Sequence, residues 1–253
     1  MWTDDQFEEL EQEEHSLTEE AIVATLLTLT STKNDLEKEL RSLYQKYGKD
    51  GVVTYSEMRK WVSEKDHRRR LTLLYLFVAD SFDTSFDLFE ANFKNHLKEI
   101  VLKEARFFDV KIDVDEILEL TWGVDDLNWH DRLWSYRNKW TNTLCSDFKR
   151  SFLKQDSIMD VLNMLEKRVV TMSNILQKLY VTETTAVGSL TRREIFKKLD
   201  IKKYRYYARE DERTCEVCGS LHGLEFPVSS YEIGVNASPM HPWCRCWEVP
   251  IVD

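Results

Sequence analysis

The stretch SIMDVLNMLEKRVVTMSNILQKL at residues 157–179 carries a sustained heptad pattern. Its apolar side chains alternate steps of four and three residues: Ile158, Leu162, Leu165, Val169, Met172, Leu176 and Leu179. This spacing places them along one face of an α-helix, and the hydroxyl of Ser157 predicts a cap for the first turn. The face can pack on another long helix of the chain, on a second copy or on a partner protein, and the pattern alone does not choose between them.

A second long helix is predicted upstream, where Ser16 and Glu19 form a capping-box pattern. Its apolar positions keep a helical spacing as far as Tyr47, and Gly48 with Gly51 predict its end because glycine adopts left-handed backbone conformations readily. We therefore expect a long amphipathic helix of the coiled-coil type.

Further helices are predicted between these two. Thr54 and Glu57 form another capping-box pattern, and the basic run Arg68 to Arg70 is typical of a solvated helix face. Apolar residues then follow a helical spacing in two more stretches: Phe86, Phe89, Phe93, Leu97 and Ile100, and later Leu127, Leu133, Tyr136, Trp140, Leu144 and Phe148. Stripes of this kind form a protein core far more often than a surface for stacking bases.

The composition separates a helical body from a different C-terminal part. Of 253 residues 42% are hydrophobic, and the seven glycines and four prolines are few for this length, which favours long helices over a sandwich or barrel. All four prolines follow position 226. We predict an elongated helical body at residues 1–190, and a C-terminal domain at 191–253 with a short basic helix capped by Thr191 and Glu194. Tyr204, Tyr206 and Ala208 alternate with Arg205, Tyr207 and Arg209, which predicts a short strand at 204–209, and further short strands are expected near 224–226 and 246–251. The predicted fold class is mainly α with a small α+β, zinc-bound C-terminal domain.

Cysteine and histidine cluster in that C-terminal part. Four of the five cysteines lie there, in a C-x2-C pair followed by HPWCRC, and the candidate ligands are Cys215, Cys218, His241, Cys244 and Cys246. Thiolates and imidazole in two short pairs are the ligands of a closed tetrahedral zinc site. Zn²⁺ takes four of them, and we favour Cys215, Cys218, His241 and Cys244, with Cys246 as the alternative to His241. The other interpretation is disulfides or unbound thiols, which the absence of an export signal disfavours.

Residues near these ligands have two readings each. Asp211 and Arg213 are candidates for fixing the ligand loops, with Arg245 pairing with a carboxylate, or they are exposed charges of a turn. His222 is either a metal neighbour or a hydrogen-bonded turn residue, and we favour the second. Cys145 lies within a helical pattern and is interpreted as a buried apolar residue.

Charge is distributed unevenly along the chain. The net charge of −10 disfavours a general nucleic-acid binder, and no stretch is apolar for long enough to cross a bilayer. The first twenty residues hold nine acidic side chains, and we expect them to form an acidic arm. A basic collar follows residue 191, with candidate contacts to DNA at Arg192, Arg193, Lys197, Lys198, Lys202, Lys203, Arg205 and Arg209.

Several motifs together resemble the phage Mu protein F-like, head-morphogenesis family of minor capsid proteins. They are TETT at residues 182–185, DERTCEVCGSLHGLEF at 211–226, GVN at 234–236 and PMHPWCRC at 239–246. The stretch LYQKYGKDGVVTYSEMRKWVSEKD at 43–66 is similar to the helical part of such proteins in phages of Gram-positive hosts. The chain departs from the family at Ala237 and Ser238, where a proline is frequent, and some relatives lack the C-x2-C pair.

The resemblance implies a protein without established catalysis, located in the virion and, during assembly, in the host cytoplasm. It implies association with the portal protein, with the scaffold or major capsid protein as further partners, and roles in head assembly and in DNA packaging or ejection. Weak non-specific DNA binding and self-association are compatible with it. Two alternatives stay open: a metal-dependent nuclease or DNA-binding protein, and a thiol redox switch that releases a metal on oxidation.

Overall fold

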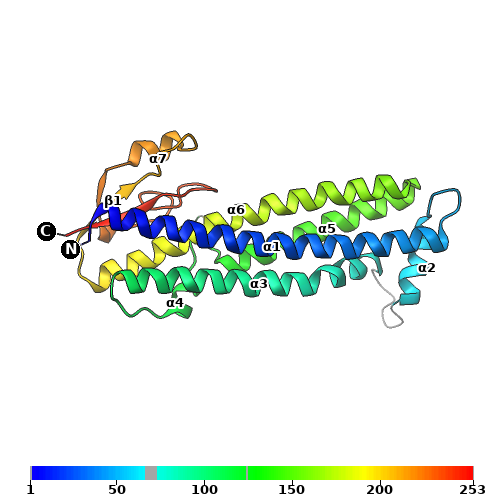
Figure 1. The fold of residues 1–253 in the computed structure, drawn as a ribbon, viewed down its shortest axis with the longest axis horizontal. Helices are drawn as coiled ribbons and strands as arrows, with labels where there is room; N and C mark the ends of the chain where they lie inside the picture. The colour runs from blue at the N-terminus through cyan, green and yellow to red at the C-terminus, as the bar shows by residue number, and fades with distance from the viewer. Residues whose placement is uncertain (1, 66–72, 124, 253) are drawn as a thin grey trace. The chain divides into compact units, whose positions relative to one another are not determined.

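The computed structural model describes residues 2–65, 73–123 and 125–252. Its helices are α1 Asp4–Tyr47, α2 Tyr55–Lys65, α3 Leu73–Phe107, α4 Val114–Glu119, α5 Trp129–Lys154, α6 Ile158–Lys198, α7 Glu216–Leu221 and the 3₁₀ turn η1 Val228–Ser230 (Figure 1). Its strands are β1 Lys203–Tyr207, β2 Glu225–Pro227 and β3 Trp247–Ile251. The predicted class, mainly α with a small C-terminal strand region, is confirmed.

Helix α1 begins well before the predicted cap. The side chain of Gln6 accepts a hydrogen bond from the Thr3 N–H at 2.9 Å, and the Thr3 hydroxyl accepts one from the Gln6 N–H at 3.3 Å. This reciprocal pair caps the helix at Thr3, so the expected start at Ser16 and the expected acidic arm are both wrong. At the other end, the left-handed residues that follow the helix are Asp50 and Gly51, with φ of 53° and 79°, rather than Gly48.

Two other predicted caps are confirmed. The Thr54 N–H donates to Glu57 Oε2 at 2.8 Å and the Glu57 N–H donates to Thr54 Oγ1 at 3.2 Å, immediately before α2. The Asp160 N–H donates to the Ser157 hydroxyl at 3.3 Å, at the start of α6. The run Arg68 to Arg70 lies outside the described residues.

Helix α6 continues without a break to Lys198, so the separate basic helix capped by Thr191 and Glu194 is wrong. Thr191 is buried, and its hydroxyl donates to the carbonyl of Val187 at 2.7 Å. Glu194 instead forms ion pairs with Arg193 and Lys197 on the helix surface. Thr191 thus lies on the buried side of α6 and Glu194 on its surface, and neither residue caps the start of a helix.

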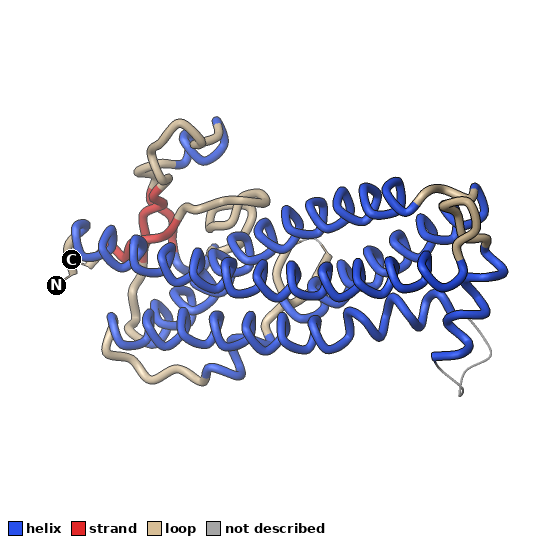
Figure 2. Tube along the Cα trace, turned by 45° about the vertical axis from the view of Figure 1, so that its right-hand side comes forward, coloured by secondary structure: helices blue, strands red, loops and turns tan. Residues whose placement is uncertain are grey.

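One compact unit contains Ala24–Ala91 and Leu133–Ile175. Segments of α1, α3, α5 and α6 run side by side in it (Figure 2). The rings of Phe82 and Trp140 meet edge to face at 4.4 Å, and the Trp140 indole donates to the carbonyl of Arg168 at 3.1 Å. The predicted apolar stripes thus meet in the core of this unit, as the burial of Phe86, Phe89, Leu144 and Phe148 shows.

The other compact unit contains Met1–Val23, Asn92–Arg132 and Leu176–Asp253. Its antiparallel sheet has the order β2-β1-β3, so β1 is central. The predicted alternation along β1 is confirmed, because Tyr204, Tyr206 and Ala208 are buried. One core cluster joins helical residues to the sheet: Phe7, Phe108, Ile195 and Phe196 with Tyr204, Trp247 and Val249. The boundary predicted between residues 190 and 191 falls inside α6 and does not coincide with the compact units.

His96 of α3 is buried beside the hydroxyls of two other helices. Its Nε2 lies 2.7 Å from Thr184 Oγ1 and 3.4 Å from Thr18 Oγ1, and its ring packs on Tyr180. Burial lowers the pKa of His96 to about 4. The imidazole is therefore neutral in the folded chain at pH values where an unfolded chain has bound a proton.

We expect His96 to make the protein sensitive to mild acid. The neutral form of His96 contributes to the free energy of unfolding at pH values above the ordinary histidine pKa. That contribution is lost as the pH falls toward the pKa of about 4 that His96 has in the folded chain. Between pH 7 and pH 5 the free energy of unfolding of the wild type should fall by roughly 2 kcal/mol relative to His96→Gln. Urea titrations at both pH values measure this difference. His130→Gln, at a half-buried histidine whose side chain is 45% exposed, is the control, and an equal change between pH 7 and pH 5 for all three proteins would contradict the expectation.

Candidate metal centre

The first ligand pair lies at the start of α7. Cys215 caps this helix, and its Sγ accepts a hydrogen bond from the Cys218 N–H at 3.3 Å. Cys218 follows on the first turn and is buried. The C-x2-C spacing thus turns both sulfurs toward the same point.

The second pair lies on a tight turn before β3. The Cys244 N–H donates to the carbonyl of His241 at 3.1 Å, and Trp243 between them adopts a left-handed conformation with φ of 69°. His241 Nδ1 lies 2.7 Å from the carbonyl of Pro242. A proton on Nδ1 satisfies that carbonyl and leaves the lone pair of Nε2 for a metal.

The structure brings all five predicted ligands together. His241 Nε2 lies 3.1 Å from Cys215 Sγ and 3.4 Å from Cys218 Sγ, while the sulfurs of Cys218 and Cys244 are 3.8 Å apart. Two thiolates bound to a tetrahedral zinc ion at about 2.3 Å would be separated by roughly 3.8 Å. Cys215, Cys218 and His241 form one group whose ligand atoms lie within 4.8 Å of one another, and Cys218, Cys244 and Cys246 form a second such group. The cluster can therefore hold a metal ion, and Cys218 belongs to both possible ligand groups.

The surroundings favour thiolates at two positions. Hydrogen bonds from Cys218 and Cys246 lower the pKa of the Cys244 thiol to about 2. Burial raises the pKa of Cys215, but the Cys218 N–H and His241 outweigh that effect, and the pKa is lowered overall. Cys145 is different, because it lies on α5, away from the cluster in sequence, and burial raises its pKa to about 12. It is half-buried rather than buried as predicted.

A small core supports the cluster from the central strand. The hydroxyl of Tyr206 donates to Cys218 Sγ at 3.4 Å and lies 4.0 Å from Cys244 Sγ. Tyr206 is fully buried and packs with Ala208 and the cysteines. The alternating pattern of β1 predicted its burial, but the direction of its hydroxyl required the structure.

The loops that carry the ligands are fixed by the residues that the sequence singled out. Both guanidinium nitrogens Nη1 and Nη2 of Arg245 donate to the Asp211 carboxylate, at 2.7 and 2.9 Å. Asp211 also accepts the Arg213 N–H at 2.9 Å. His222 Nδ1 accepts the Ala208 N–H at 3.2 Å, as a turn residue would. The loop-fixing interpretation of Asp211 and Arg245 therefore agrees with the geometry.

All four side chains of the TETT stretch on α6 have partners. The Thr182 hydroxyl accepts the Trp243 N–H at 3.1 Å, and the Thr185 hydroxyl donates to the Cys244 carbonyl at 2.8 Å. Glu183 receives the Trp122 indole N–H at 2.9 Å and the Arg132 guanidinium at 3.2 Å. Thr184 contacts His96 at 2.7 Å. The two outer threonines thus hold the turn between His241 and Cys244.

We expect Thr185→Val to weaken metal binding. Valine preserves the shape but removes the donor to the Cys244 carbonyl, and outer hydrogen bonds of this kind contribute about 10- to 100-fold to metal affinity. Competition with a chromophoric zinc chelator measures the change. Thr171→Val is the matched control on α6, because its hydroxyl donates only to the carbonyl of Lys167 among the described contacts. Equal affinities of all three proteins would show that the turn does not depend on α6.

Fewer side chains of the basic collar are free to contact DNA than the sequence indicates. Arg192 is buried, so it is removed from the candidate contacts to DNA. The other collar side chains are paired with carboxylates or, for Lys198, with the carbonyl of Lys111; their acidic partners are Glu194, Asp200, Asp211 and Glu225. A concavity of about 590 Å³ is lined by Arg193, Lys197 and Lys202 among others.

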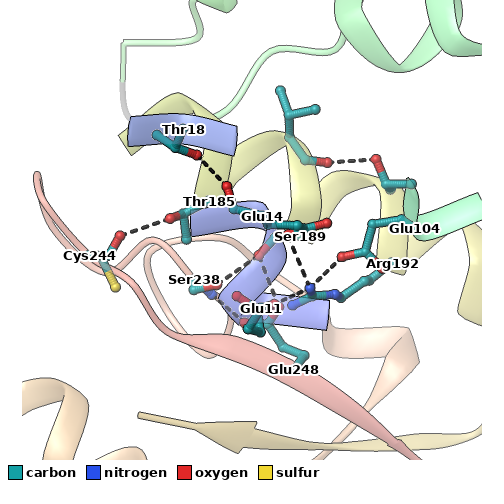
Figure 3. A network of polar contacts seen from close by, with 12 residues as sticks. Glu11, Glu14, Thr18, Glu104, Thr185, Ser189, Arg192, Ser238, Cys244 and Glu248 are labelled. Carbon is teal, nitrogen blue, oxygen red and sulfur yellow. Dashed lines mark hydrogen bonds and ion pairs between the residues drawn. The ribbon is translucent and has the colours of Figure 1, made fainter. Parts of the chain in front are cut away.

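Arg192 belongs to a buried charge network that sequence reasoning missed (Figure 3). It forms ion pairs with Glu11 and Glu104 and lies 3.7 Å from Glu14. Glu248 of β3 is also buried, and it accepts hydrogen bonds from the Ser189 and Tyr231 hydroxyls and from the Ser238 N–H. No local pattern signals this network, because its members come from distant parts of the chain.

Residues 150–249 match the family described as Phage Mu protein F like protein, a family of phage head-morphogenesis proteins. The match spans the last five residues of α5, all of α6, strands β1 and β2, the first three residues of β3 and the candidate metal centre, and it confirms the family resemblance over these residues. No curated protein and no solved structure matches the chain. Within the described ranges, no helix has both the length and the apolar character needed to cross a bilayer.

Proposed function

We propose that this chain is a phage minor head protein that acts in prohead assembly and in DNA packaging or ejection through association with the portal. The observation that carries the proposal is the family match over residues 150–249, which includes the ligand cluster and the α6 threonines that hold it. The virion and, during assembly, the host cytoplasm are its proposed locations. Scaffold or major capsid protein and further copies of the chain are additional proposed partners.

We assign the metal as zinc and its role as structural. The proposed ligands are Cys215, Cys218, His241 and Cys244, because their contacts of 3.1, 3.4 and 3.8 Å form one connected set. Cys246 is then a fifth donor outside the set. Four protein ligands leave no open position for a substrate or water, and His222 is used in a turn, so we propose a protein without enzymatic activity.

The portal proposal is tested by assembling heads with and without the full-length protein. Co-purification with the portal protein, and extra density at the portal vertex in electron microscopy that disappears without this chain, are the expected results. Cys218→Ser should reduce incorporation if the metal centre presents the docking surface, with Cys145→Ser as the matched control. Normal heads that package DNA without the protein would overturn the proposed role.

Weak, non-specific DNA contact is proposed at the exposed collar residues. The test uses substitutions rather than truncation of α1, because Phe7, Leu10 and Glu14 are buried and their loss would damage the fold. Lys197→Glu combined with Lys202→Glu should reduce duplex binding at low salt several-fold, because each phosphate contact adds to counterion release. Lys149→Glu with Lys154→Glu, exposed on α5, is the charge-matched control. Equal binding by both variants would assign the collar to a protein partner.

A further inference from the structure

Three glutamates converge on one point in the interior of the unit that contains the sheet. Glu11 and Glu14 come from α1 and Glu104 comes from α3, and one carboxylate oxygen of each lies within 4.8 Å of the others. Glu14 is 5% exposed and Glu104 is 0% exposed. Carboxylates are rarely buried to this extent unless their charge is compensated.

The compensation within the described residues is incomplete. Arg192 contacts Glu11 and Glu104 and lies 3.7 Å from Glu14, so one guanidinium faces three carboxylates. Lys103, which precedes Glu104 on α3, forms its ion pair with Glu13 instead. Glu248 has its own three donors and does not share its charge with the cluster through a hydrogen bond. Arg209 and Arg245 line the adjoining cavity, but both pair with Asp211, so Arg192 is the one described cation that forms ion pairs with these three carboxylates.

Some of the carboxylate oxygens also lack hydrogen-bond partners. Glu14 Oε1 and Glu104 Oε2 are buried without a described donor. A cavity of about 40 Å³ adjoins them and is lined by Glu11, Glu14, Gly188 and Arg192 among others. A volume of this size holds one small ion or water molecule. A Cβ at Gly188 would lie 3.8 Å from Glu104 Oε1 and 3.9 Å from Glu14 Oε2, so the absence of a side chain there keeps this space open.

We propose that Glu11, Glu14 and Glu104 bind a divalent cation that prefers oxygen ligands, such as Mn²⁺, Mg²⁺ or Ca²⁺. The cation and Arg192 together supply three positive charges against the three carboxylates. The ligands are hard oxygen donors, whereas the cysteine cluster is a soft thiolate site, so the two sites select different metals. Bound there, the cation cross-links α1 and α3 beside α6.

Protons are the competing way to neutralise the cluster. Burial raises the pKa of Glu104 to about 7, and burial followed by repulsion from Glu104 raises the pKa of Glu14 well above its ordinary value. A cation and protons compete for the same oxygens, so cation affinity should increase with pH in this range.

The test is a Mn²⁺ titration of the full, zinc-loaded chain at pH 7.5 or thereabouts, followed by electron paramagnetic resonance or calorimetry. We expect one saturable site, competition by Ca²⁺ or Mg²⁺, and a rise in melting temperature on binding. Glu14→Gln combined with Glu104→Gln should weaken Mn²⁺ binding at least tenfold. Glu20→Gln, an exposed position on α1, is the matched control and should bind as the wild type does.

The glutamine variant keeps the shape of the side chains and removes charge, so its melting temperature without cation should equal or exceed that of the wild type. The melting temperature without cation therefore shows whether the double variant fails to bind Mn²⁺ because its ligands are changed or because it does not fold. Absence of saturable binding to the wild type at millimolar Mn²⁺, Mg²⁺ and Ca²⁺, or undiminished binding by the double variant, would overturn the proposal and assign the cluster to buried protons.

Discussion

Cys218→Ser is expected to abolish tight zinc binding and to unfold the loops around α7 and the turn before β3. Cys218 contacts both His241 and Cys244, so its removal breaks the connected set of ligands at its centre. Structural zinc supplies on the order of 10 kcal/mol or more of folding free energy in small zinc domains, which is more than any single packing contact here can provide. Elemental analysis of protein purified without added metal should find about one zinc per wild-type chain and almost none in the variant.

Most helical signal should survive this change. Helix α7 contains six residues, whereas α1 and α6 contain 44 and 41, so circular dichroism at 222 nm should fall only slightly. Amide exchange should become fast in β2, α7 and residues 239–246. Cys246→Ser is the matched variant, and under the proposed ligand set it should keep zinc. If Cys246→Ser loses zinc while His241→Ala keeps it, the fourth ligand is Cys246 instead.

Arg192→Met is expected to destabilise the protein by roughly 3–5 kcal/mol when no divalent cation is added. Methionine replaces much of the volume but leaves Glu11, Glu14 and Glu104 without the guanidinium that faces them. Removing one partner from a buried ion pair leaves an uncompensated buried charge, and this is the source of the large cost. Urea unfolding at pH 7 and above measures the effect, because acid would protonate the glutamates and hide it.

The neighbouring residue provides the control. Arg193 is about one quarter exposed and pairs with Glu194 on the surface, so Arg193→Met should change the free energy of unfolding by less than about 1 kcal/mol. Similar losses for the two arginines would mean that the buried network does not stabilise the fold. A triple variant that also carries Glu14→Gln and Glu104→Gln should recover part of the loss, since it removes the charges that Arg192 faces.

Local signals in the sequence predicted much of the fold. The caps at Thr54 and Ser157 were predictable because a capping residue and its partner lie three positions apart. Strand β1 was predictable because apolar and charged residues alternate along it. The ligand set was recognisable because cysteine and histidine have few other reasons to cluster at this spacing.

The missed features depend on contacts between distant residues. The start of α1 carries Phe7 and Leu10 among many acidic residues. Because acidic residues dominate this stretch, the sequence did not indicate that these two apolar side chains are buried in the core. Arg192 resembled its exposed neighbours in a basic run, while its partner Glu11 lies 181 positions away. Thr182 and Thr185 were noticed as part of a motif, but their hydrogen bonds reach 61 and 59 residues along the chain. No window of sequence contains both partners of these contacts.

The way α6 holds the second ligand turn has a consequence for how this surface can diversify. Thr182 and Thr185 bind the N–H of Trp243 and the carbonyl of Cys244, which are main-chain groups that every residue other than proline possesses. The Trp243 side chain itself is 45% exposed. Its left-handed backbone conformation admits glycine or asparagine without strain and disfavours β-branched residues. The identity of the outward-facing side chain at position 243 is thus uncoupled from the anchoring of the turn, and it can change while the candidate ligands His241 and Cys244 beside it keep their places.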